Sequence, residues 1–138
     1  MVQSIVLRTD AGVEPHDSGL AKRILIVNDQ QTVVIFLHEI LEELGFAVCS
    51  ASSGTEGMSL LQQYAFEGII LDLDMPLMDG ITTLKRLRTL SNTVPIIVMS
   101  GDPTRSAMIK AIQAGAKDYL LKPISHEILK FKCLRLFG

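Results

Sequence analysis

Short apolar runs alternate with stretches of helical periodicity from Arg23 to the end of the chain. The runs are typical of strands buried on both faces, and the stretches between them repeat apolar residues every three or four positions, as amphipathic helices do. The pattern predicts strands over residues 24–27, 46–49, 68–73, 94–99 and 119–121. It predicts helices over residues 33–44, 55–65, 79–90 and 103–114, and a last helix that follows Ser125.

End signals and apolar faces support the predicted helices. Gly45 and Gly115 suit helix C-termini, and Pro103 suits the first turn of the fourth helix. Asp79 suits a helix start and Ser125 an N-cap. The side chains expected to point inward are Val33, Leu37, Ile40, Leu41, Leu44, Ile128 and Leu129. Those expected on outer faces are Glu39, Glu42, Glu43, Lys85, Arg86 and Arg88.

Five strand and helix pairs in this order imply an α/β doubly wound sheet. The simplest arrangement is flavodoxin-like, a five-stranded parallel sheet of order 2-1-3-4-5 with five helices. A chain of 138 residues has room for one such domain, which we place over residues 23–138. Residues 11–19 are rich in Gly, Pro and Asp, so we expect residues 1–22 to form a flexible extension or linker.

The charge balance excludes some direct partners. With 13 Lys and Arg against 15 Asp and Glu, a net charge of −2 gives no electrostatic reason to bind nucleic acid or an anionic membrane. No apolar run reaches the ~18 residues that span a bilayer, and no signal peptide is recognisable, so we expect a cytoplasmic protein. Cys49 and Cys133 lack the spacing of a metal or redox pair and are expected to be ordinary reduced thiols.

Polar residues gather where the predicted strands end. They are Asn28, Asp29, Asp72, Asp74, Ser100 and Lys122. In a doubly wound sheet, ligands bind at the carboxyl ends of the strands near the switch point between strands 1 and 3. Asp29 and Asp72 would form an oxygen-rich pocket of the kind that holds Mg²⁺, while Ser100 and Lys122 could bind a phosphoryl oxygen. Taken singly, Asp29 could equally cap a helix, Ser100 could be a turn residue and Lys122 a solvated charge.

Four sequence runs resemble the receiver domain of two-component response regulators, of the chemotaxis-regulator type. They are ILIVND (24–29), LDLDMPLMDG (71–80), IIVMSGD (96–102) and AGAKDYLLKP (114–123), in the order and spacing of that family. The resemblance implies a phosphoacceptor signalling domain that catalyses only its own phosphorylation and dephosphorylation. The implied donor is a histidine kinase or phosphotransfer protein.

The resemblance also implies roles for individual residues. Asp72 would be the phosphoacceptor, with Mg²⁺ held by the side chains of Asp29 and Asp72, by the backbone carbonyl of Asp74 and, through water, by Asn28. Lys122 would bind the phosphoryl group, and the Lys122–Pro123 peptide bond would be cis. Ser100 and Tyr119 would be the switch pair, and phosphorylation would shift the face formed by the fourth helix, fifth strand and fifth helix.

Asn28 departs from the family pattern, in which two acidic residues usually follow the first strand. One negative charge is therefore missing, and we expect weaker Mg²⁺ binding and altered dephosphorylation. A receiver-like interaction module that works without phosphorylation remains an alternative. A haloacid-dehalogenase phosphatase would also place two Asp residues after a strand, but it usually continues with Gly-Thr rather than Met75-Pro76. A flavin-binding protein of this fold would need a Ser/Thr-rich loop after the first strand, which is absent.

The last helix is unusually apolar, with Phe131, Leu134, Leu136 and Phe137 spread around more than one face. Part of it is expected to pack against a partner chain in a dimer or against a downstream output domain. The three histidines, His16, His38 and His126, have no spacing that indicates a metal site and are expected on the surface.

Overall fold

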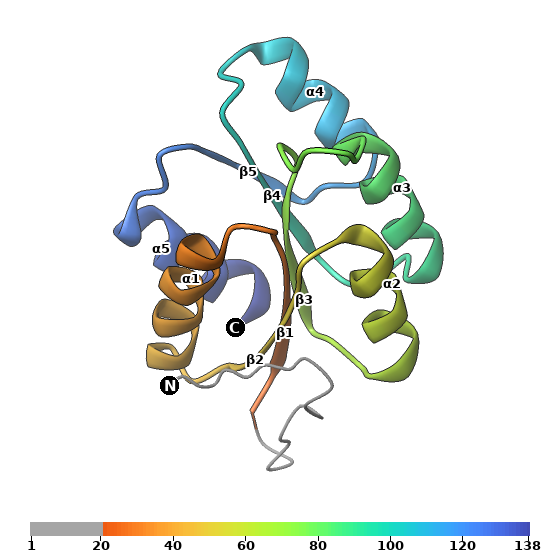
Figure 1. The fold of residues 1–138 in the computed structure, drawn as a ribbon. Coiled ribbons are helices and arrows are strands. Elements are labelled where there is room, and N and C mark those ends of the chain that lie inside the picture. The colour runs from red at the N-terminus through yellow and green to blue at the C-terminus, as the bar shows by residue number, and fades with distance from the viewer. Residues whose placement is uncertain (1–20) are drawn as a thin grey trace.

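A computed structural model of the chain describes residues 21–138. It contains one parallel sheet of five strands, ordered β2-β1-β3-β4-β5, which confirms the predicted topology (Figure 1). The strands are β1 (Arg23–Val27), β2 (Ala47–Ala51), β3 (Gly68–Asp72), β4 (Ile96–Ser100) and β5 (Asp118–Leu121). Apart from Ala21 and Lys22, the predicted N-terminal extension lies outside the described residues, as does His16.

Five helices connect the strands and cover both faces of the sheet. They are α1 (Gln31–Glu43), α2 (Gly54–Gln63), α3 (Gly80–Leu90), α4 (Arg105–Gln113) and α5 (His126–Phe137). Figure 1 shows α1 and α5 on one face and α2, α3 and α4 on the other. No helix in residues 21–138 is long and apolar enough to cross a membrane.

Alternate strand residues build two separate cores, because successive side chains of a strand point to opposite faces. Leu71 and Val98 contribute to the core under α2, α3 and α4, whereas Ile70 and Ile97 contribute to the core under α1 and α5. Every residue of β3 and β4 is buried. Because both strands are packed on both faces up to their last residues, those residues are held in fixed positions at the edge of the sheet.

Several predicted details of the helices are wrong. Pro103 precedes α4, whose N-cap is Thr104 with its hydroxyl accepting from the Ala107 amide at 3.1 Å. His38 is buried, although a surface position was expected, and Ile128 is exposed, although it was expected to point inward. Helix α1 contacts α5 as well as the sheet, so more of its circumference is covered than a single apolar stripe suggests.

The end of α5 is also more buried than expected. Phe137 is in the core under α1 and α5, where its ring lies edge-on to Phe46 with centroids 6.3 Å apart. A side chain at Gly68 would collide with the Phe137 ring, so the glycine makes room for it. Phe131 and Leu134, by contrast, are exposed, as predicted for a helix that is apolar on more than one face.

Both cysteines are free and buried. Burial raises the pKa of Cys49 to about 11, against a smaller opposing effect of Arg23. Burial likewise raises the pKa of Cys133 to about 12. Both thiols therefore stay protonated near neutral pH, which agrees with the predicted ordinary reduced cysteines.

Arg88 of α3 is half-buried rather than on an outer face. Its guanidinium donates to the carbonyl oxygens of Ser91 at 3.0 Å, Val94 at 2.7 Å and Gly115 at 2.7 Å. Burial lowers the pKa of Arg88 from its ordinary value, but the group remains charged near neutral pH. These bonds join the end of α3 to the approach to β4 and to the turn before β5.

Replacing Arg88 with alanine is expected to lower the free energy of unfolding by about 2 kcal/mol, because three carbonyls lose a charged donor and water replaces it only in part. Urea unfolding followed by circular dichroism measures this change. Arg86 is exposed on the same helix, so Arg86→Ala is the matched control and is expected to have little effect. Equal destabilisation by both substitutions would contradict the role of the three bonds.

Candidate functional site

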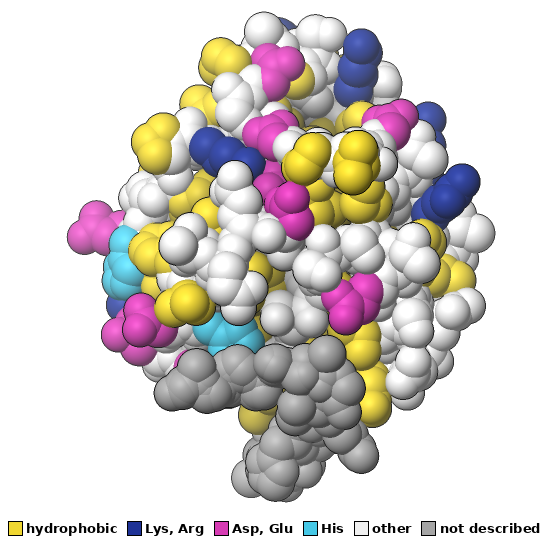
Figure 2. All heavy atoms as spheres, viewed as in Figure 1, with side chains coloured by type: hydrophobic (Ala, Val, Ile, Leu, Met, Phe, Trp, Pro, Cys, Tyr) yellow, Lys and Arg dark blue, Asp and Glu magenta, His cyan; other side chains and the backbone are white. Residues whose placement is uncertain are grey.

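The strand ends bring the predicted site residues to one edge of the sheet. Asp72 is the last residue of β3 and Ser100 the last of β4, while Asn28 directly follows β1. Ser100 pairs with Leu121, the residue before Lys122. Parallel strands end at the same edge, so residues far apart in sequence become neighbours there. In the same view as Figure 1, Figure 2 shows acidic side chains with a basic one over the upper ends of the central strands.

Asp72 and Lys122 form the central ion pair. Lys122 Nζ lies 2.8 Å from Asp72 Oδ1 and 3.2 Å from Asp74 Oδ2. The Asp72 side chain is only 2% exposed, so its charge is held where water cannot solvate it well. Burial by itself lowers the pKa of Lys122, but hydrogen bonds and negative charges from Asp72 and Asp74 outweigh burial and raise it. Lys122 is therefore a fixed positive charge beside Asp72.

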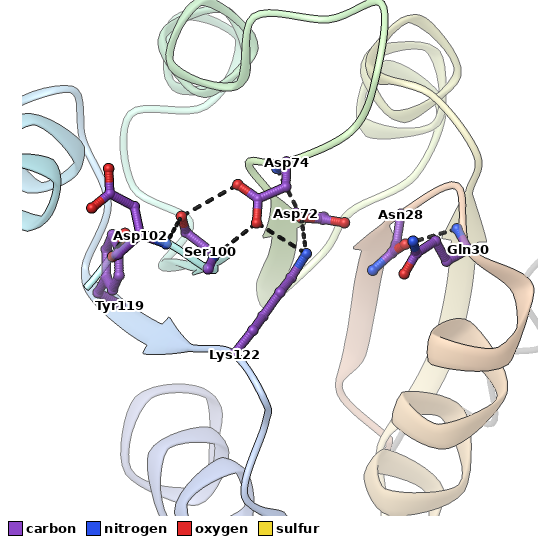
Figure 3. Close-up of polar contacts among 9 residues, drawn as sticks. Asn28, Gln30, Asp72, Asp74, Ser100, Asp102, Tyr119 and Lys122 are labelled. Carbon is purple, nitrogen blue, oxygen red and sulfur yellow. Dashed lines mark hydrogen bonds and ion pairs between the residues drawn. The ribbon is translucent and has the colours of Figure 1, made fainter. Parts of the chain in front are cut away.

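The two carboxylate oxygens of Asp72 differ. Oδ1 accepts from Lys122 Nζ and from the backbone amide of Asp74, at 2.9 Å, which is an Asx turn after the strand. Oδ2 has no hydrogen bond to any of the described residues. Figure 3 shows the Asp72 carboxylate between Lys122 and Asn28. One oxygen of a buried carboxylate is thus left for an external partner.

Asp74 reaches across the edge to β4. Its Oδ2 accepts from the Gly101 amide at 2.8 Å, and its Oδ1 accepts from the Ser100 hydroxyl at 3.3 Å. With Lys122, which lies 3.2 Å from Oδ2, the Asp74 carboxylate therefore has three donors close to it (Figure 3). The sequence predicted only a backbone role for Asp74, and it did not single out Gly101, whose amide could have been suspected from its place directly after Ser100.

Ser100 is connected to Tyr119 through Asp102. The Asp102 amide donates to Ser100 Oγ at 3.1 Å, and the Tyr119 hydroxyl donates to the Asp102 carbonyl at 2.7 Å (Figure 3). A pocket of about 270 Å³ lies beside this chain of bonds, between the sheet edge and α4. Its lining includes Asp74, Ser100, Asp102, Tyr119 and Lys110. The structure thus links the site to α4 and β5, although sequence reasoning did not identify Asp102.

Asn28 and Asp29 differ in their surroundings. Asn28 is buried, and its Oδ1 accepts from the Gln30 amide at 2.8 Å. Its Nδ2 has no hydrogen-bond partner in the described part of the chain. Asp29 is exposed, and the N-cap of α1 is Gln30 rather than Asp29, so the helix-cap alternative for Asp29 is wrong. Its carboxylate is therefore not used in starting the helix.

The Asp72 carboxylate offers one oxygen atom, Oδ2, to a hard divalent cation. Across residues 21–138, no three His, Cys, Asp or Glu side chains are grouped as a metal site. The predicted set needs only two carboxylates, Asp29 and Asp72, because a backbone carbonyl and water complete the octahedral shell of Mg²⁺ in many proteins. Asp72 Oδ2 lacks a hydrogen bond within the described chain, and an oxygen in that state suits a cation ligand.

Two other predictions about this region are confirmed. The Lys122–Pro123 peptide bond is cis. Asp79 is the N-cap of α3, with its carboxylate accepting from the Ile81 amide at 3.2 Å, so it has the structural role expected of it.

The chain and its fold match proteins of one family. The family model described as "Response regulator receiver domain" matches residues 24–132. Chemotaxis protein CheY of Bacillus subtilis is 37% identical over 105 residues, which cover 75% of this chain and 88% of CheY. Transcriptional regulatory protein PrrA of Mycobacterium tuberculosis is 34% identical over 108 residues, 78% of this chain, and the chain spans only 46% of PrrA.

The solved structure "BeF3 Activated DrrB Receiver Domain" superposes with a TM-score of 0.75 at 25% identity, covering 85% of this chain and 97% of that one. The chain therefore belongs to the response regulator receiver domains, the signalling domains of two-component systems.

Proposed function

We propose that this chain is a phosphoacceptor domain in which Asp72 takes a phosphoryl group from a histidine kinase or a phosphotransfer protein. The observation that supports this most is the buried Asp72 carboxylate, with Oδ1 held by Lys122 and Oδ2 free of hydrogen bonds within the described residues. Membership of the receiver family sets aside a haloacid-dehalogenase phosphatase and a flavin protein. A receiver-like module that works without phosphorylation is the remaining alternative.

In the proposed transfer, a carboxylate oxygen of Asp72 attacks the phosphorus atom of the donor. The bond from phosphorus to the leaving group breaks, the leaving group keeps its electron pair, and an acyl phosphate forms on Asp72. Lys122 would stabilise the negative charge that develops on the phosphoryl oxygens. Asp29, Asp72, the carbonyl of Asp74 and, through water, Asn28 would hold Mg²⁺. When bound, the ion would supply further positive charge against the phosphoryl oxygens.

The proposed output runs from Ser100 to the face formed by α4, β5 and α5. A phosphoryl group adds strong acceptor oxygens, which would draw Ser100 toward Asp72, and Tyr119 would follow through its link to Asp102. This face exposes large apolar side chains, which a partner chain or a downstream output domain would cover. They are Met108, Ile109, Ile112, Leu121, Ile128 and Phe131.

Intact mass spectrometry after incubation with acetyl phosphate and Mg²⁺ tests the proposed transfer. We expect a phosphoryl adduct that is lost on brief alkaline treatment, as an acyl phosphate is, and that does not form when the metal is chelated. A folded protein that binds Mg²⁺ but forms no adduct would favour the module that works without phosphorylation.

Asn28→Asp is expected to tighten Mg²⁺ binding about tenfold, since it replaces the unpartnered Nδ2 with a charged oxygen beside Asp72. Without metal, the same change should lower stability, because it adds a third carboxylate next to Asp29 and Asp72. Calorimetric Mg²⁺ titration and thermal unfolding in a chelator measure the two effects. Asn92→Asp adds the same charge at an exposed position and is the control. Unchanged Mg²⁺ affinity in Asn28→Asp would contradict the expected weakening by Asn28.

A further inference from the structure

The side chain of Asp74 contacts Lys122 and Ser100, the two groups that the proposed function assigns to a phosphoryl group, and also the backbone amide that follows Ser100. Lys122 Nζ is 3.2 Å from Asp74 Oδ2, the Gly101 amide donates to the same oxygen at 2.8 Å, and the Ser100 hydroxyl donates to Oδ1 at 3.3 Å. Figure 3 shows Ser100 and Lys122 on either side of the Asp74 carboxylate, next to Asp72. A carboxylate thus rests in an anion-binding arrangement built from β4 and the residue after β5.

Two of these donors cannot serve Asp74 and a phosphoryl oxygen together. A serine hydroxyl and a backbone amide each carry one hydrogen, so Ser100 and Gly101 each make one strong donated bond. Lys122 has three ammonium hydrogens, and its ammonium group already contacts the carboxylates of both Asp72 and Asp74. A phosphoryl group on Asp72 that binds Ser100 and Gly101 must therefore displace the Asp74 carboxylate.

We propose that Asp74 is a positioning residue that occupies the phosphoryl-binding donors before phosphorylation and must leave them when Asp72 is phosphorylated. This inference rests on the proposed function of Asp72. It has two consequences. Asp74 weakens the binding of any phosphoryl-like anion at Asp72, and in the resting protein it holds Ser100, which is bonded onward through Asp102 to Tyr119.

Asp74→Asn tests the first consequence, because it keeps the size and the backbone carbonyl but removes the charged acceptor. Beryllofluoride, an analogue of the phosphoryl group, is titrated at saturating Mg²⁺ while the amide resonances of Ser100 and Gly101 are followed by NMR. We expect Asp74→Asn to bind beryllofluoride about tenfold more tightly than the natural chain. The Asp74 side chain is 42% exposed, so the fold should persist, and Asp74→Ala is a second variant with the same expected direction.

Asp79→Asn separates donor occupation from a general effect of charge. Asp79 lies on the same loop and is an exposed cap of α3, a position where asparagine caps equally well. Loss of the negative charge of Asp79 should change beryllofluoride affinity by less than about twofold, since exposed charges are screened by solvent and salt. An equal gain in Asp79→Asn and Asp74→Asn would overturn the inference.

The resting protein supplies a second readout. Without beryllofluoride, the Gly101 amide resonance should move upfield in Asp74→Ala, because its hydrogen bond is lost, and it should not move in Asp79→Asn. If the natural chain and Asp74→Asn bind beryllofluoride equally tightly, the inference fails while the proposed function stands. If neither the natural chain nor any of the variants binds beryllofluoride, the proposed function itself fails.

Discussion

Asp72→Asn is expected to abolish the phosphoryl adduct that forms with acetyl phosphate and Mg²⁺. An amide oxygen carries no negative charge and is a poor nucleophile, so the step that forms the acyl phosphate has no substitute. Asparagine has nearly the same shape and can still accept the Asp74 amide hydrogen bond made by Oδ1. The variant should therefore fold, and intact mass spectrometry should show unmodified protein only.

Asp79→Asn is the matched control for this prediction, since Asp79 is a carboxylate in the segment after β3 that caps α3 and does not contact Asp72 or Lys122 in the described structure. It should form the adduct at the rate of the natural chain. An adduct of the same lability on Asp72→Asn would mean that another carboxylate is the acceptor, and Asp72 would lose its proposed role.

Lys122→Ala is expected to slow adduct formation by about 10²- to 10³-fold, the usual effect of removing one preorganised group that stabilises charge in a transition state. The initial rate of adduct formation, measured by intact mass, gives this ratio. Lys117→Ala removes an exposed lysine from the turn before β5 and should leave the rate unchanged. If Lys122→Ala forms the adduct as fast as the natural chain, Lys122 does not stabilise the transition state as proposed.

The same substitution should also lower stability by about 1–2 kcal/mol, because Asp72 stays buried without its cation, while partial exposure of Lys122 limits the loss. The pKa of Lys122 is raised in the folded state, so its contribution is fully present below the ordinary lysine pKa and disappears as pH rises through the raised value. The difference in urea midpoint between Lys122→Ala and the natural chain should therefore be constant near neutral pH and shrink only in strong alkali.

Each strand could be predicted from the sequence because it leaves a local signal. The order and direction of the strands then follow from their alternation with helices, as in doubly wound sheets. The run from Gly68 to Leu71 is apolar without interruption, as a strand covered by helices on both faces requires, and every residue of β3 is buried. Asp72 and Lys122 were expected to meet, although 50 residues separate them, because both follow such runs and parallel strands end at a common edge.

The burial of helix faces could be predicted only in part. His38 was expected on the outer face of the first helix, the face that carries Glu39 and Glu42, yet it is buried on α1. Phe137 looked like part of an exposed apolar face, yet it fills the space over Gly68. The residues that contact Phe137, Phe46 and Gly68, come from a distant part of the chain, and helical periodicity contains no information about them.

The sequence by itself determined the fold class, the edge of the sheet where polar groups collect, and most of those groups, although not Gly101 or Asp102. Only the tertiary structure decided how they pair. Asp74 turns to Ser100, Gly101 and Lys122 because the ends of β4 and β5 place these donors within its reach, while Asp72 keeps one oxygen without a hydrogen bond in the described chain. Hydrogen bonds depend on distances of a few tenths of an ångström between residues from different strands, and that precision arises only when the strands are packed together.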